Sequence, residues 1–92
     1  MPSALLRLVW ELISFARGKV RRLCLESLQI GPKTPGDISR SSGVHLSHIS
    51  RALRELRSKG LVECLTPKAA KNRIYRLTET GRRTLKGLKE LS

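Results

Sequence analysis

The sequence predicts a mainly α-helical single domain that carries one small β-hairpin, in the order α-α-α-α-β-β-α. Apolar residues recur at the three- and four-residue spacing of amphipathic helices over most of the chain. Two short apolar runs near the end flank a basic turn, which is typical of a hairpin. The chain has 92 residues, one small domain's length. A chain this short buries only about 60–65% of the surface that its unfolded form exposes, so a lone monomer is expected to be marginally stable.

We expect the domain to span residues 1–92 without repeats or a low-complexity tail. Its expected parts are an N-terminal dimerisation helix at 3–16, a core at 19–78 that contains a helix pair at 34–59 and a hairpin at 61–77, and a C-terminal helix at 79–91.

The first helix is expected from Ser3 to Ala16. Its apolar stripe contains Leu5, Leu8, Val9, Leu12, Ile13 and Ala16. Further apolar side chains lie outside that stripe, namely Leu6, Trp10 and Phe15. Because a helix that is apolar on more than one side needs more than one neighbour, we expect a second copy of the chain to supply one.

A second helix is expected over Lys19–Gln29, and the segment Gly31-Pro32-Lys33 ends it. The residues expected to point inward are Val20, Leu23, Cys24 and Leu28. Cys24 and Cys64 each lie within an apolar run, so we interpret both as small buried apolar residues rather than as a disulfide or a redox sensor.

The segment Thr34-Pro35-Gly36-Asp37 is a strong helix start, because Thr34 can cap the helix, Pro35 suits its first position and Asp37 can complete a capping box. Gly43 stops this helix after a short run, and Gly43-Val44-His45 forms a three-residue turn. A short turn with a glycine is what joins the two helices of a helix-turn-helix.

The next helix is expected from Leu46 to Lys59. Its inward residues are Ile49, Ala52, Leu53 and Leu56, with Gly60 as a left-handed cap and Leu61 folded back onto Leu56. Its polar side presents Ser47, His48, Ser50, Arg51 and Arg54, with no acid before Glu55. These side chains donate hydrogen bonds to phosphates and base edges. The alternative is an ordinary solvated helix face. The preceding turn and the following basic hairpin argue against this alternative.

Two short strands are expected at Leu61–Leu65 and Ile74–Leu77. Residues 66–76 contain four cations and no acid, and the tip carries Lys68, Lys71 and Arg73. Such a ribbon suits phosphates or a minor groove, although a merely soluble loop is the alternative. Thr78 is expected to cap the last helix, over Glu79–Leu91, whose apolar stripe contains Leu85, Leu88 and Leu91.

The charge balance points to a polyanionic partner. Nineteen Lys and Arg against seven Asp and Glu give a net charge of +12, which favours nucleic acid over an anionic membrane. Only three aromatic residues are present, which argues against single-strand binding by base stacking, because that mode needs exposed aromatic platforms. The apolar part of the first helix is interrupted by charges and too short to cross a bilayer, and we expect a cytoplasmic protein.

No catalytic pattern is present. The sequence has no glycine-rich phosphate loop, no Ser/His/Asp or Cys/His set and no paired carboxylates, so we expect neither an enzyme nor a cofactor. His45 and His48 lie three positions apart without a nearby thiolate or carboxylate, so no metal site is expected.

Together these segments resemble the winged helix-turn-helix transcription regulators of the MarR and ArsR type, in particular the small archaeal ones. The resemblance covers about residues 19–83 and is carried by Lys33–Ile38, His48–Leu56, Lys59–Glu63 and Arg73–Gly81. It implies that residues 46–59 form the recognition helix, with Ser47, His48, Ser50, Arg51 and Arg54 facing DNA. It also implies that Lys68, Lys71 and Arg73 form the tip of the wing. Lys33 and Thr34 are further candidates for contacts with the DNA backbone.

Members of this family are usually dimers that pair through their terminal helices. The implied interface residues here are Leu5, Leu8, Val9, Leu12, Ile13, Leu85, Leu88 and Leu91. The close cysteine pair of the metal-sensing members is absent, and the chain is shorter than regulators with a ligand pocket between their dimerisation helices. We therefore expect no dedicated site for a small-molecule effector.

The expected function is sequence-specific binding of double-stranded DNA by a homodimeric transcription regulator. Two alternatives remain open: a non-specific architectural protein that coats the nucleoid, and a winged-helix module that binds other proteins within a larger assembly.

Overall fold

The computed structural model describes the backbone of residues 3–90 and the side chains of residues 10–90. Over that range the chain forms five helices and one antiparallel pair of strands. Their bounds are α1 Ser3–Ala16, α2 Lys19–Ile30, α3 Pro35–Ser42, α4 Leu46–Ser58, β1 Val62–Cys64, β2 Tyr75–Leu77 and α5 Glu79–Glu90. The predicted class and element order are confirmed, and each helix boundary lies within one residue of its expected position where the two can be compared.

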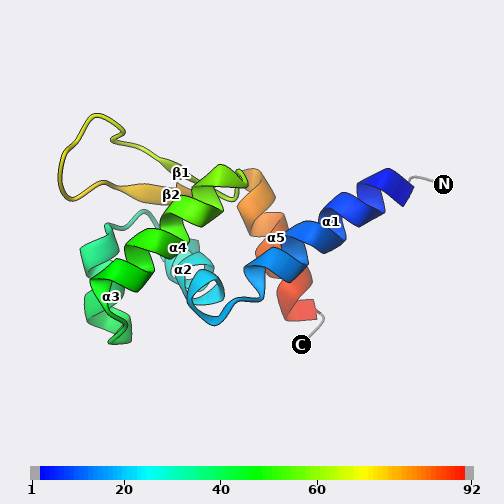
Figure 1. Ribbon diagram of the computed structural model, residues 1–92, viewed down its shortest axis with the longest axis horizontal. Coiled ribbons are helices and arrows are strands. Elements are labelled where there is room, and N and C mark those ends of the chain that lie inside the picture. Colours follow the sequence, from blue (N-terminus) through cyan, green and yellow to red (C-terminus); the bar gives the residue numbers. More distant parts are fainter. Residues whose placement is uncertain (1–2, 91–92) are drawn as a thin grey trace.

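The molecule is elongated, with principal extents of 45 × 27 × 20 Å. Helix α1 and the loop between β1 and β2 lie at opposite ends of the long axis, and α4 crosses between them (Figure 1). Helix α2 packs behind α4, and α5 packs against both α1 and α2. Among the described residues, no helix combines the length and apolarity that crossing a membrane requires.

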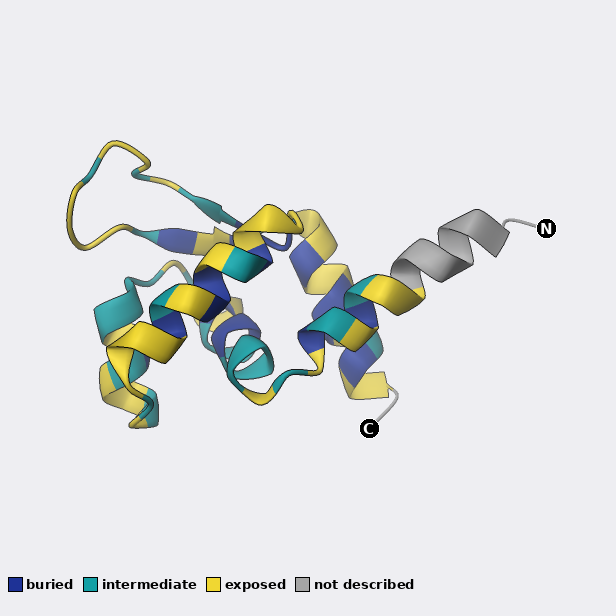
Figure 2. Cartoon of the chain, viewed as in Figure 1, coloured by how far each residue is buried: buried dark blue, intermediate teal, exposed yellow. Residues whose placement is uncertain are grey.

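One hydrophobic core joins these elements. Its fully buried side chains come from α2, α3, α4, the start of β1 and α5, and the largest are Leu25, Leu28, Ile38, Ile49, Leu53, Leu56, Leu61 and Leu85. The buried sides of α2 and α4 face each other, whereas the outer side of α4 is exposed (Figure 2). Each fully buried Leu or Ile contributes about 1.5–3 kcal/mol through removal from water, so the burial of this core is the main source of stability.

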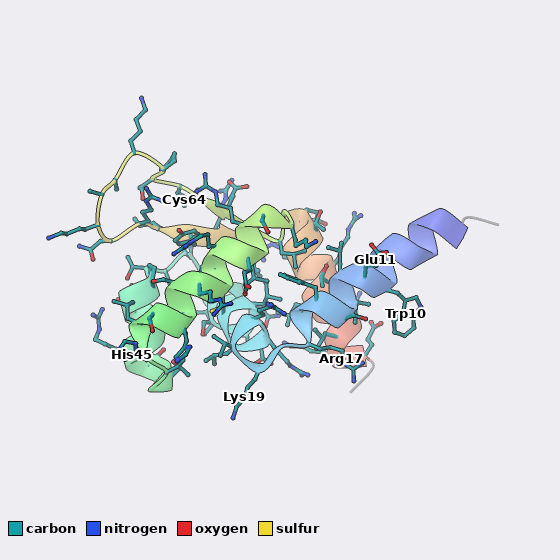
Figure 3. All side chains as sticks on the ribbon, in the orientation of Figure 1. Trp10, Glu11, Arg17, Lys19, His45 and Cys64 are labelled. Atoms are coloured by element: carbon teal, nitrogen blue, oxygen red, sulfur yellow. The ribbon has the colours of Figure 1, made fainter. Side chains whose placement is uncertain are left out.

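The two cysteines differ in their surroundings, and both are free thiols. Cys24 is completely buried in α2, and this burial raises the pKa of its thiol to about 12. It therefore stays protonated at neutral pH and packs as a small apolar residue, as predicted. Cys64 is only half-buried, at the end of β1 that leads into the hairpin loop (Figure 3), so the expectation of burial is met in part.

The end of α4 has the predicted left-handed cap. Gly60 has a φ of 74°, and its amide donates to the carbonyl of Arg57 at 3.0 Å. The amide of Leu61 donates to the carbonyl of Leu56 at 3.0 Å, which completes a Schellman motif. The helix thus stops one residue before the expected Lys59 and turns directly into β1.

Thr78 fastens the start of α5 to this turn. Its hydroxyl accepts the amide of Gly81 at 3.0 Å, as predicted for a cap, and donates to the carbonyl of Gly60 at 2.6 Å. Its own amide donates to the carbonyl of Leu61 at 3.1 Å. The end of α4, the start of β1 and the start of α5 therefore form one hydrogen-bonded junction.

The strands pair in the register Val62 with Leu77, Glu63 with Arg76 and Cys64 with Tyr75. A further bridge, which the sequence did not predict, joins Lys33 to Tyr75. The amide of each residue donates to the carbonyl of the other, at 3.0 and 2.9 Å. The hairpin is thereby attached to the segment that begins α3.

Gly81 and Gly87 offer a matched test of this packing, since both lie within α5. A Cβ at Gly81 would lie 2.0 Å from the carbonyl oxygen of Leu61, which is backbone and cannot move freely. A Cβ at Gly87 would meet only the end of the Ile13 side chain, at 3.0 Å. Gly81→Ala should lower the free energy of unfolding by about 1–3 kcal/mol or more, measured by urea denaturation.

Gly87→Ala should be close to neutral, because the gain in helix propensity, about 0.8–1.0 kcal/mol, offsets a small movement of Ile13. Equal effects of the two substitutions would contradict the close approach of α5 to Leu61.

Candidate nucleic-acid interface

Helices α3 and α4 form the predicted helix-turn-helix, and both ends of α3 are capped. The Thr34 hydroxyl accepts the amide of Asp37 at 3.1 Å, and the Asp37 carboxylate accepts the amide of Thr34 at 3.2 Å. Hydrogen bonds from Thr34, together with the charge of Arg40, lower the pKa of Asp37. The capping box is therefore complete above the ordinary pKa range of aspartate and weakens as the pH falls through the lowered value.

The turn between the two helices is held by its own side chains. Gly43 has a φ of 77°, and its amide donates to the carbonyl of Ser39 at 2.9 Å. The Ser39 hydroxyl donates to the carbonyl of Val44 at 2.6 Å, and the amide of Val44 donates to the Ser42 hydroxyl at 3.2 Å. These bonds fix the direction in which α4 leaves the turn.

His45 caps α4, a role that the sequence analysis missed. Its Nδ1 accepts the amide of Ser47 at 3.1 Å and lies 2.8 Å from the Ser47 hydroxyl. Its ring meets that of His48 edge to face, with centroids 6.2 Å apart, at the junction of α3 and α4 (Figure 3). Within the described part of the chain, no group of three His, Cys, Asp or Glu side chains is arranged to hold a metal ion.

The outer side of α4 presents the predicted recognition residues to solvent. Ser47, His48, Arg51 and Arg54 are exposed, and Ser50 is half-buried. They lie opposite the buried face formed by Ile49, Ala52, Leu53 and Leu56. The exposed side of α4 is therefore mainly polar, and the DNA major groove, about 12 Å wide, admits a helix of this kind.

A groove of about 550 Å³ separates α4 from the hairpin loop. It is lined by Pro35, Gly36, Leu46, Ser50, Arg54, Arg57, Ala70, Lys71, Asn72, Arg73 and Tyr75. Four of these residues are cations and none is an acid, so the groove has a strongly positive potential. Arg57 was missed as a candidate, although it lies three residues after Arg54 on the same side of α4.

The loop of the hairpin has internal order. The amide of Leu65 donates to the carbonyl of Ile74 at 2.7 Å, and the amide of Ile74 donates to the Thr66 hydroxyl at 3.0 Å. Asn72 has a φ of 55°, which asparagine tolerates better than most residues. Lys68, Lys71 and Arg73 are all exposed, and Arg73 Nε also donates to the carbonyl of Ala69 at 2.9 Å.

Lys33 and Thr34 lie beside the groove but are partly engaged in the fold. Both are half-buried. The backbone of Lys33 pairs with Tyr75, and the Thr34 hydroxyl accepts the α3 amide described above. Their neighbours Pro35 and Gly36 line the groove, so the two candidates stand at its edge.

On the opposite flank, α4 faces the start of α2 across a smaller cavity of about 190 Å³. His48 and Arg51 line this cavity together with Lys19, Arg21 and Glu55. The predicted recognition residues are thus divided between two flanks, with Ser50 and Arg54 on the hairpin side and His48 and Arg51 on the α2 side.

The predicted dimer residues are placed partly inside the single chain. Ile13, Leu85 and Leu88 are buried in the core, where α1 packs against α5, and Leu12 is half-buried. The remaining candidates lie outside the described side chains, and these are Leu5, Leu8, Val9 and Leu91. Trp10 is 54% exposed, and its ring extends from α1 into open space (Figure 3).

One known protein family matches most of the chain. A family model described as "Methanogenesis regulatory protein FilR1, N-terminal domain" matches residues 10–91. No curated protein matched the chain in sequence.

Several solved structures are similar over most of the chain. The transcriptional repressor BigR from Xylella fastidiosa is 26% identical, with 90% of this chain and 81% of that chain covered and a TM-score of 0.74. The homodimeric winged helix-turn-helix DNA-binding domain Mb0332 from Mycobacterium bovis is 25% identical, with 97% and 79% covered and a TM-score of 0.70. A regulator of the MarR family from Enterococcus faecalis V583 is 24% identical, with 99% and 82% covered and a TM-score of 0.76, a likeness of fold.

The cap on α4 can be tested with two substitutions of His45. His45→Ala removes the acceptor for the amide of Ser47 and should lower the free energy of unfolding by about 1 kcal/mol. His45→Asn supplies a side-chain oxygen in place of Nδ1 and should retain most of that stability. Urea denaturation measures both, and equal losses in the two variants would show that His45 does not act as a cap.

Proposed function

Because this chain belongs to the family of the N-terminal domain of methanogenesis regulatory protein FilR1, which matches residues 10–91, we propose that it binds specific sequences in double-stranded DNA as a homodimeric transcription regulator. Its fold is that of the winged-helix regulators of the MarR and ArsR type. In these terms α4 is the recognition helix, and the wing consists of residues 62–77.

The observation that carries the proposal is the positive groove between α4 and the wing. A DNA strand that follows this groove would bring its phosphates near Arg54, Arg57, Lys71 and Arg73, without an acid among the lining residues. The exposed side of α4 would then enter the major groove, where Ser47, His48, Ser50, Arg51 and Arg54 reach base edges or phosphates. Lys68 and the other wing cations would hold the backbone or the adjacent minor groove, with Lys33 and Thr34 as further backbone contacts.

The dimer belongs to the proposal for a physical reason. Helix α1 extends away from the body of the molecule (Figure 1), and its Trp10 side chain is largely exposed. Burial of so large a side chain against a second copy is favourable, and the related Mycobacterium bovis domain is described as homodimeric. Two-fold symmetry would place the two recognition helices about 34 Å apart, one turn of DNA.

A second function has some support from the charge distribution. Four cations on α5 are exposed and lie outside the groove, namely Arg82, Arg83, Lys86 and Lys89. Cations spread over more than one side suit an architectural protein that coats DNA without regard to sequence. The regulator remains the preferred proposal, because the groove concentrates unopposed cations beside the recognition helix.

Selection of bound duplexes from a random pool separates the two functions. The regulator should enrich a near-palindrome whose half-sites have centres about one helical turn apart, since the dimer imposes its own symmetry on the site. Sequencing of the bound pool is the measurement. A pool that stays random after several rounds, while binding remains tight, would instead favour the architectural protein.

Arg51→Ala and Arg73→Ala should act differently. Loss of a base contact by Arg51→Ala should cost about 1–3 kcal/mol of discrimination at one position of each half-site. Arg73→Ala should weaken binding to all duplexes and reduce the salt slope by about one unit per protomer. Competition gel shifts at several salt concentrations measure both effects.

Arg82→Ala is the matched control, because it removes one exposed arginine from α5, outside the groove. Its binding should stay close to that of the unaltered protein. If Arg51→Ala left the sequence preference intact, the assignment of α4 as the reading element would be wrong.

A further inference from the structure

Arg21, near the start of α2, makes three contacts that reach two other helices. Its Nη1 donates to the carbonyl of Phe15 at 3.1 Å, and its guanidinium lies over the Phe15 ring, 4.1 Å from the centroid. Its Nε donates to a carboxylate oxygen of Glu55 at 3.2 Å. Its side chain is 30% exposed. Arg21 therefore connects the last turn of α1, through Phe15, to α4, through Glu55.

Glu55 is the single acid of α4, and both of its carboxylate oxygens face arginines. Oε1 lies 3.2 Å from Arg21 Nε, and Oε2 lies 3.9 Å from Arg51 Nε. The Arg51 side chain is 79% exposed, and its ion pair with Glu55 is the contact that the structure gives it. Because Glu55 is anchored by Arg21, it draws Arg51 toward the α2 flank of the recognition helix.

An acid at this place costs affinity for DNA, since it repels phosphates that approach α4. The same acid can improve discrimination. A long exposed arginine samples many rotamers, and a fixed carboxylate one helical turn away restricts them. The Arg51–Glu55 pair is exposed, and exposed ion pairs add little to stability. We therefore expect the pair to affect the position of Arg51 rather than the free energy of unfolding.

We propose that Arg21 and Glu55 form a brace that positions Arg51 for base reading and fixes the recognition helix to the end of α1. This inference rests on the proposed function. Glu55 and Arg21 are positioning residues, which act through Arg51 and need not touch DNA. Because α1 is the proposed dimerisation helix, the brace also makes the direction of Arg51 depend on how the two protomers are joined.

Lys59 makes a second contact with Phe15. Its Nζ lies 5.6 Å from the centroid of the Phe15 ring, so this ring approaches both Arg21 and the residue that follows α4. Cations over an aromatic face are attracted by the ring, and both contacts converge on one side chain of α1. The end of α1 is thus linked to α4 through Arg21 and to the cap of α4 through Lys59.

The test compares affinity for a selected duplex with affinity for a scrambled duplex of the same length, measured by fluorescence anisotropy. Glu55→Gln keeps the shape of the side chain and removes its charge. Affinity for the scrambled duplex should rise about two- to fivefold, and the preference for the selected duplex should fall about twofold, the factor that an exposed i,i+4 ion pair is worth. Thermal unfolding should remain close to that of the unaltered protein.

Arg21→Gln separates positioning from charge. It removes a cation, so affinity for scrambled DNA should not rise, yet the preference should fall as far as in Glu55→Gln. The double variant should lose no more preference than either single variant, because both break the same chain of contacts.

Glu79→Gln is the matched control. It breaks an exposed ion pair of the same i,i+4 type, with Arg83 at 3.3 Å on α5, and removes the same charge. It should raise affinity for both duplexes by the same factor. An unchanged preference in Glu55→Gln and Arg21→Gln, or losses that multiply in the double variant, would overturn the brace and leave the proposed function in place. If the unaltered protein did not prefer the selected duplex, the proposed function would fail and the brace with it.

Discussion

The apolar face of α4 packs against α2, and this contact determines which side chains of α4 face solvent. Ile49, Leu53 and Leu56 are fully buried on one side of the helix, so the opposite side must face solvent. A core of this density does not let a helix rotate gradually, because each rotation would expose leucine and open cavities. The two ends of α4 are then fixed by His45 and by the turn at Gly60. The position of the proposed recognition surface is thus a consequence of hydrophobic packing.

The same packing must overcome a large repulsion. A net charge of +12 on 92 residues opposes a compact chain, and the core is small. Several arginines are partly neutralised by acids on the surface, as in the pairs of Arg76 with Glu63 and Arg22 with Glu26. The groove beside the wing has no such acid among its lining residues, so its four cations are not balanced within the groove. The ion pairs that reduce repulsion and the cations that are available to a polyanion therefore lie on different parts of the surface.

Local rules predicted most of the fold. The capping box at Thr34, the glycine ends of α3 and α4, and the outer face of α4 follow from nearest neighbours and from periodicity. The bridge of Lys33 to Tyr75 and the contact of Arg21 with Glu55 join distant parts of the chain and left no local signal. A histidine cap was missed because other residues are the usual caps. Periodicity showed that Leu85 and Leu88 would be buried, but it could not show that α1 of the same chain takes part in covering them.

The bridge between Lys33 and Tyr75 divides the hairpin into a part attached to the rest of the fold and a part that is not. The strands are hydrogen-bonded to the segment that begins α3. The turn from Thr66 to Arg73 lies beyond the last backbone hydrogen bond between the two sides of the hairpin, from Leu65 to Ile74. Insertions or deletions in that turn would change how far its lysines reach without altering strand register or the pose of α4. The reach of the proposed wing is therefore set by the length of this turn, whereas the position of α4 is set by the scaffold.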